Sequence, residues 1–222
     1  MNIAIIAAMS KELALLFPLI DNLSEKTVKA YKFHTGSIGP HSIVALRSGI
    51  GKVNAALATS AVIDEFQPDL VINTGVAGGV GRTNVLDVII PSTVAYHDVW
   101  CGPGTVPGEA ADCPREFPSA FSDETVRAVG AKRGLLASGD IFVSTVDEVR
   151  HILSLYPDAV AVDMESASIA QTCYLRQVPF GCIRVISDTP GSDDNIAQYQ
   201  NFWDDAPRAT FNTLLHLLST LP

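Results

Sequence analysis

The chain has 222 residues, of which 47% are hydrophobic and 18% charged, and its formal net charge is -9 at pH 7. This length and apolar content are enough for one α/β domain with a large core. The 15 Lys and Arg residues are scattered along the chain, so we expect neither a nucleic-acid partner nor a membrane partner, both of which need a basic surface.

The N-terminal segment is the first of several short apolar runs rich in Val and Ile. Residues 2–7 lack a preceding basic region, and Lys11 and Glu12 follow closely, so this run predicts a buried strand rather than a signal peptide. No apolar run approaches the roughly 18 residues that span a bilayer. We therefore expect a cytoplasmic protein whose 4 cysteines, which lack CxxC spacing, remain reduced.

Apolar runs alternate with segments of helical periodicity along the chain. The predicted strands are 2–7, 42–47, 69–73, 87–94, 134–139, 159–162 and 180–187, and the predicted helices are 10–20, 51–66, 123–132, 145–155, 163–177 and 194–219. This alternation predicts a single α/β domain over residues 1–222, with a mixed, mostly parallel central sheet flanked by helices. Residues 99–121 are rich in Pro and Gly, show no periodicity and predict a long functional loop.

The turns that follow the strands are the candidate site, because ligands of such sheets bind beyond the carboxyl ends of the strands. The first turn leads into a helix that Ser10 is expected to cap, which puts Glu12 in the first helical turn. An ionised carboxylate at this place suits a general base that activates water. The alternative is a solvated Glu at a helix start.

Two glycine-containing turns come next in the chain. Residues 48–54 read SGIGKVN and residues 73–80 read NTGVAGGV, and both let the backbone approach a ligand closely. Neither is a nucleotide fingerprint, because the spacing is not GxGxxG and Lys52 lacks the frame of a P-loop. Purely structural turns explain both segments equally well.

Two late strands end in carboxylates. One runs into Asp163, Met164 and Glu165, where Glu165 suits hydrogen bonds from a ribose diol and Met164 an apolar surface beneath the sugar. A capping carboxylate pair is the alternative interpretation. The other strand ends at Asp188, which suits a purine N7, and Arg184 is placed to orient a carboxylate of the same network.

The sequence predicts no metal ion and no cofactor. His97 and Asp98, like the acidic positions Asp188, Asp193 and Asp194, lack the loop spacing that is typical of a hard-cation site. A turn and a helix start explain the last two aspartates.

Taken in order, these segments resemble the methylthioadenosine/S-adenosylhomocysteine nucleosidases of the purine nucleoside phosphorylase-like superfamily. The matching segments are AIIAAMSKE, RSGIGKVNAA, INTGVAGGV, YHD, SGDIFVS, VDMESASIA and VPFGCIRVISD, which extend the resemblance from Met1 through the C-terminal helix. The resemblance implies a nucleoside phosphorylase-like fold, a homodimer, and hydrolysis of the N-glycosidic bond of 5'-methylthioadenosine or S-adenosylhomocysteine with release of adenine.

The resemblance also implies roles for individual positions. Glu12 would be the water-activating base, and Asp188 would assist the leaving purine. The implied substrate-binding positions are Met9 and Ile50 near the sugar, Phe142 and Val143 at the purine, Met164 and Glu165 at the ribose, Ser187 and Arg184 in support of the acidic groups, and Gly78 and Asp163 within the same motifs.

Two departures from the family pattern keep other functions open. Val76 stands where many members have Ser, and the segment from Trp100 to Pro118 differs from the usual sequence. The alternatives are a phosphate-dependent purine nucleoside phosphorylase, a futalosine-type nucleosidase and a nucleoside-binding module without turnover. Hydrolysis is favoured over phosphorolysis because the anionic Glu12 would repel a phosphate bound beside it.

Overall fold

The computed structural model describes residues 1–205 and 207–221, so residues 206 and 222 of the expected domain lie outside the described residues. The strands are β1 (Asn2–Ala7), β2 (Asp21–Val28), β3 (Tyr31–Ile38), β4 (His41–Arg47), β5 (Leu70–Gly79), β6 (Val88–Ile89), β7 (Thr93–Tyr96), β8 (Glu116–Pro118), β9 (Leu135–Ser138), β10 (Ala159–Asp163) and β11 (Phe180–Asp188). The helices are α1 (Ser10–Ala14), the 3-10 helix η1 (Phe17–Leu19), α2 (Lys52–Phe66), α3 (Asp123–Ala128), α4 (Val146–Leu155), α5 (Ser166–Arg176), α6 (Asn195–Asp205) and α7 (Pro207–Thr220).

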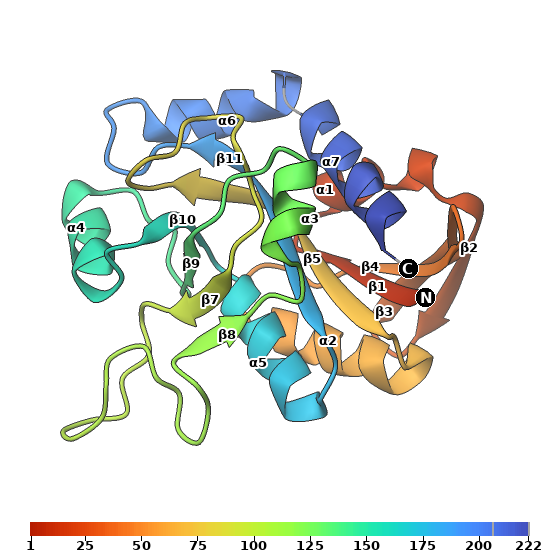
Figure 1. Ribbon diagram of the computed structural model, residues 1–222, viewed down its shortest axis with the longest axis horizontal. Helices are drawn as coiled ribbons and strands as arrows, with labels where there is room; N and C mark the ends of the chain where they lie inside the picture. Colours follow the sequence, from red (N-terminus) through yellow and green to blue (C-terminus); the bar gives the residue numbers. More distant parts are fainter. Residues whose placement is uncertain (206, 222) are drawn as a thin grey trace.

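All these strands form one sheet with helices on both sides (Figure 1). Its main path runs β2-β3-β4-β1-β5-β10-β9-β7-β8, and β11 lies against both β5 and β6. The pairs β1 with β4, β1 with β5, β5 with β11, β9 with β10 and β7 with β9 are parallel. The pairs β2 with β3, β3 with β4, β5 with β10, β6 with β11 and β7 with β8 are antiparallel. The expected single α/β domain with a mixed sheet is therefore confirmed, and β4, β1, β5 and β11 form the parallel core of the sheet.

The apolar strands pack on both of their faces because side chains alternate along a strand. In β1, Ala4 and Ile6 belong to the core beneath α2 and α5, whereas Ile3 and Ile5 belong to the core that α1 and α7 cover. Figure 1 shows α2 and α5 side by side on one side of the sheet, with α3 and α7 on the other. The sheet is thus held rigidly from both sides, which fixes the turns at its carboxyl edge.

Prolines account for most differences between the predicted and observed elements. The predicted helix 10–20 ends at Ala14, and Pro18 lies in the separate helix η1. The predicted strand 87–94 is divided into β6 and β7 on either side of Pro91, which cannot donate to a strand ladder. The predicted helix 194–219 is divided into α6 and α7, and α7 begins at Pro207.

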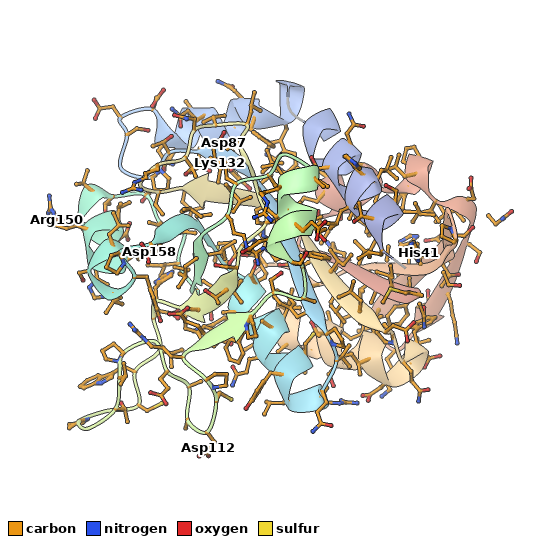
Figure 2. All side chains as sticks on the ribbon, in the orientation of Figure 1. His41, Asp87, Asp112, Lys132, Arg150 and Asp158 are labelled. Carbon is orange, nitrogen blue, oxygen red and sulfur yellow. The ribbon has the colours of Figure 1, made fainter. Side chains whose placement is uncertain are left out.

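Two further features differ from the predictions. The hairpin of β2 and β3 was not predicted, because β2 is exposed along nearly its whole length and carries polar residues without apolar alternation. The loop over residues 99–121 contains the short strand β8, which pairs with β7. The rest of this loop extends away from the sheet, with Asp112 at one outer end (Figure 2).

The described residues contain no helix that is long and apolar enough to cross a membrane. All four cysteines are free thiols, and Cys113, Cys173 and Cys182 are buried while Cys101 is exposed. The expectation of free thiols is therefore met by the structure.

Candidate active site

An open pocket of about 630 Å³ lies where the carboxyl ends of β1, β10 and β11 meet the last residues of β5. It brings together every site residue predicted from the sequence except Arg184, which lies buried beneath it. The lining residues are Ala8, Met9, Glu12, Ile50, Val76, Ala77, Gly78, Ile141, Phe142, Val143, Val162, Asp163, Met164, Glu165, Ser187, Asp188 and Tyr199.

Glu12 is fixed at the pocket by backbone N–H groups on two different elements. Its Oε2 accepts a hydrogen bond from Met9 N at 2.8 Å, and its Oε1 accepts one from Val76 N at 3.0 Å. The N-cap of α1 is Met9, so the prediction that Ser10 caps this helix is wrong. Glu12 is only 3% exposed, which also excludes the interpretation of a solvated Glu at a helix start.

Burial raises the pKa of Glu12, because a carboxylate loses its hydration in the protein interior. The Arg184 guanidinium and the backbone N–H groups of Met9, Val76 and Ala8 oppose this rise. A carboxylate with a raised pKa is a stronger base than an exposed one, yet its attachment to two N–H groups preserves one orientation. This combination suits a group that takes a proton at a fixed place.

Arg184 is the only cation described beneath the pocket, and it serves the carboxylates around it. Its Nη2 donates to Asp163 Oδ2, to Asn73 Oδ1 and, at 3.0 Å, to Ser166 Oγ. It also lies 3.9 Å from Glu165 Oε2. Arg184 is 1% exposed and does not line the pocket, so it contacts the carboxylates from below and not through the pocket space.

Glu165 faces the pocket from the N-cap position of α5. Its Oε1 accepts a hydrogen bond from Gly51 N at 2.9 Å, which ties the β10–α5 turn to the glycine turn before α2. Burial, together with the neighbouring charge of Asp163, raises the pKa of Glu165 to about 7. Glu165 therefore titrates within the physiological pH range.

Asp188 ends β11 and is held from two sides. Ser187 Oγ donates to its Oδ1 at 2.6 Å, and Asn195 Nδ2 donates to its Oδ2. Burial raises the pKa of Asp188 against the effect of these two donors. A carboxyl group that is buried and readily protonated suits donation of a hydrogen bond to a basic ring nitrogen.

The opposite wall of the pocket is apolar and aromatic. Phe142 packs edge-on against Tyr199 at 5.4 Å between ring centroids, and the Tyr199 hydroxyl reaches Met9 Sδ at 3.6 Å. A flat heterocycle can stack in such a place. The sequence analysis missed Tyr199 and Asn195, because the helical periodicity of their segment indicated core packing and gave no sign that α6 returns over the site.

The described part of the chain offers no place for a metal ion, since it contains no group of three or more His, Cys, Asp or Glu side chains in suitable positions. The described residues that line the pocket include no Lys, Arg or His. The charged groups of the pocket are thus carboxylates alone, with one guanidinium behind them.

A carboxylate-lined pocket at the carboxyl edge of this sheet defines a member of the Phosphorylase superfamily, whose family model matches residues 2–219. The 5'-methylthioadenosine/S-adenosylhomocysteine nucleosidase of Anoxybacillus flavithermus is 41% identical over 207 residues, which are 89% of each chain. The enzyme of the same name from Staphylococcus aureus is 38% identical and covers 99% of this chain and 100% of its own.

Solved structures of nucleosidases with this name have the same fold as this chain. The nucleosidase of the same name from S. pneumoniae, bound to the transition-state inhibitor MT-ImmA, superimposes with a TM-score of 0.93 at 37% identity over 100% of both chains. That from Neisseria meningitidis, bound to methylthio-immucillin-A, gives a TM-score of 0.91 at 33% identity over 99% of both chains. The chain belongs to the 5'-methylthioadenosine/S-adenosylhomocysteine nucleosidase family, which confirms the resemblance found in the sequence.

Gly75 provides a test of the buried arrangement below the pocket. Its φ is +150°, and a Cβ at this position would overlap Glu12 Oε1 and lie 2.6 Å from Arg184 Nη1. We expect Gly75→Ala to lower the free energy of unfolding by about 1 to 3 kcal/mol, as overpacking of a core does. Gly102→Ala is the control, because Gly102 also has a positive φ but has open space around it. Equal thermal denaturation midpoints for the two variants would contradict the close packing of Glu12 against the β5 backbone.

Proposed function

We propose that this protein hydrolyses the N-glycosidic bond of 5'-methylthioadenosine and S-adenosylhomocysteine, releasing adenine and the 5-thio-substituted ribose. The observation that carries the proposal is the charge of the pocket, in which Glu12, Glu165 and Asp188 face a common space whose described lining holds no cationic side chain. Such a space stabilises positive charge on a sugar and disfavours a phosphate nucleophile. The names and bound inhibitors of the relatives agree with this substrate class.

In the proposed mechanism, the bond between C1' and N9 lengthens first, and positive charge develops on the ribose. Glu12 takes a proton from the attacking water, and its negative charge stabilises the oxocarbenium-like sugar. Glu165 accepts hydrogen bonds from the ribose hydroxyls and so fixes the anomeric carbon relative to Glu12. General-base catalysis by such a group accelerates a reaction by roughly 10² to 10⁴.

Asp188 is proposed to act on the leaving group. Its raised pKa supports a protonated or hydrogen-bonding carboxyl that helps the purine N7 take up a proton as adenine departs. Phe142 and Val143 are proposed to hold the purine, with the aromatic ring of Phe142 against its face. The neutral leaving group lowers the barrier to breaking the glycosidic bond.

Hydrolysis is favoured over phosphorolysis because the nearby basic side chains are already engaged. Arg184 binds Asp163, and Lys52 Nζ donates to both carboxylate oxygens of Asp98 at 3.0 and 2.9 Å. Arg47, at the end of β4, is exposed and donates to Ser10 Oγ at 3.4 Å. Lys11 Nζ lies 3.5 Å from the centroid of the Trp203 ring and outside the pocket lining. A phosphate beside Glu12 would therefore meet a carboxylate with no basic side chain among the described lining residues.

We further propose that the protein is a cytoplasmic homodimer and serves methionine salvage, since the released sugar retains the thio group. Large apolar side chains are exposed on neighbouring helices and on the long loop, and surfaces of this kind favour association. They are Val53 and Leu57 on α2, Tyr174 and Leu175 on α5, and Trp100. The family resemblance supports the dimer, and we propose that the loop after Asp98 lends apolar residues to the partner's pocket for the 5'-substituent.

The proposal is tested by incubating the purified protein with methylthioadenosine, S-adenosylhomocysteine, adenosine and inosine, each with and without phosphate. We expect adenine and the free thio-sugar from the first two nucleosides, at rates that do not depend on phosphate. A strict phosphate requirement would show a phosphorylase, and no release of purine from any of them would contradict the proposed function.

Two substitutions test the roles of the carboxylates. We expect Glu12→Gln and Asp188→Asn each to lower kcat by at least about 10², because each removes a proton-transfer group while nearly preserving the side-chain shape. In each variant the new amide nitrogen cannot accept one of the two hydrogen bonds that the carboxylate accepts. Circular dichroism and the thermal midpoint verify that each variant is folded. A folded variant with wild-type kcat would remove that residue from the mechanism.

A further inference from the structure

Three charged side chains that the mechanism leaves without a role meet beside the pocket. They are Lys52, the first residue of α2, Asp98, which follows β7, and Asp140, which follows β9. Lys52 Nζ donates to both oxygens of Asp98, Asp140 N donates to Asp98 Oδ2 at 2.8 Å, and Lys52 N donates to Asp140 Oδ1 at 2.8 Å. We call Lys52, Asp98 and Asp140 the Lys52 clamp.

The clamp is connected to the site at both of its ends. At one end, the N–H of Gly51, adjacent to Lys52, donates to Glu165 Oε1 at 2.9 Å. Gly51 has a φ of +93°, and this backbone conformation presents two successive N–H groups to two different carboxylates, Glu165 and Asp140. At the other end, Asp140 precedes Ile141 and Phe142, which line the pocket.

The clamp is partly shielded from solvent at Lys52 and Asp98, whereas the side chain of Asp140 is 48% exposed. The side chains of Lys52 and Asp98 are 24% and 23% exposed, and Lys52 Nζ also lies 5.4 Å from the centroid of the Tyr96 ring. Exposed ion pairs contribute little to stability, whereas a network of hydrogen bonds with a fixed geometry defines positions. Its two attachments indicate that this network orients the pocket rather than only stabilising the fold.

We propose that Lys52, Asp98 and Asp140 are positioning residues that hold the Gly51 N–H on Glu165 and thereby fix the carboxylate that receives the ribose hydroxyls. This inference rests on the ribose-binding role of Glu165 in the proposed function. The clamp acts through Gly51 on the sugar end of the ligand, so its loss weakens recognition of a nucleoside more than recognition of a free purine.

The hydrogen bond from the Gly51 N–H also affects the pKa of Glu165. The groups that face Glu165 are Asp163 from β10, Arg184 from β11, Glu12 from α1 and the Gly51 N–H. Since that N–H stabilises the carboxylate form, its loss raises the pKa of Glu165 further above about 7. Nucleoside binding requires the ionised form, so the pH below which binding fails moves upward when the clamp is broken. His97 is also near the clamp, and burial lowers its pKa.

The test uses the full chain and two ligands, adenine and the uncleavable C-nucleoside 9-deazaadenosine. Calorimetry gives the Kd of each from pH 5.5 to 8.5 for the wild type, Lys52→Met, Lys52→Arg and Asp98→Asn. We expect Lys52→Met and Asp98→Asn to weaken binding of 9-deazaadenosine about tenfold at neutral pH and to raise the pH below which this binding fails. Adenine binding should weaken far less, because the clamp meets the purine end of the pocket only through the chain from Asp140 to Phe142. Lys52→Arg is expected to retain most of the wild-type affinity because it can still pair with Asp98.

Arg176→Met is the matched control. Arg176, at the end of α5, pairs with Asp64 on α2, the helix that begins at Lys52, so the substitution also removes a paired positive charge but away from the clamp. We expect this variant to bind both ligands as the wild type does. The positioning role would be overturned if Lys52→Met and Asp98→Asn bound 9-deazaadenosine with the wild-type Kd and the wild-type pH dependence. It would also be overturned if both variants bound adenine and 9-deazaadenosine equally more weakly than the wild type. If one variant does not fold, the other decides between these outcomes. Turnover of methylthioadenosine by the wild type tests the proposed function separately, since neither ligand in the binding series is cleaved.

Discussion

The guanidinium of Arg184 lies beneath a group of carboxylates that would otherwise be costly to bury together. It pairs directly with Asp163, lies 3.9 Å from Glu165 Oε2 and attracts the charge of Glu12. An unpaired buried charge is strongly destabilising, so these acids depend on this one cation. The remaining donors include backbone N–H groups and the hydroxyls of Ser138 and Ser166, both of which donate to Asp163. The parallel sheet brings these partners to one edge from turns that are far apart in sequence.

This arrangement explains how the site selects its chemistry. Arg184 satisfies the acids from below, while their free sides face a pocket whose described lining is apolar or anionic. Positive charge on a sugar is stabilised there, and a second anion is not. Burial raises the pKa values of Glu12, Glu165 and Asp188, and for Glu165 the pKa rises to about 7. Stability and function oppose each other at this site, as is common for buried acids.

The sequence predicted those parts of the molecule that depend on local pattern. Apolar runs and helical periodicity located the strands of the parallel core, and carboxylates at strand ends pointed to Glu12, Glu165 and Asp188. The hairpin of β2 and β3 escaped prediction because β2 is exposed along nearly its whole length and lacks apolar alternation. Tyr199 and Asn195 escaped because only the path of α6 over the pocket reveals them. The clamp of Lys52, Asp98 and Asp140 depends on three turns meeting in space, which no local pattern encodes.

The central claim is that the anionic pocket delivers water, and not phosphate, to the anomeric carbon. The most direct measurement is mass spectrometry of the sugar formed from methylthioadenosine in heavy-oxygen water that also contains saturating phosphate. The account predicts a free thio-sugar that carries one heavy oxygen at its anomeric carbon. The sugar must be analysed before its anomeric oxygen exchanges with the solvent. A thio-sugar 1-phosphate without the heavy isotope in its glycosidic oxygen would contradict it.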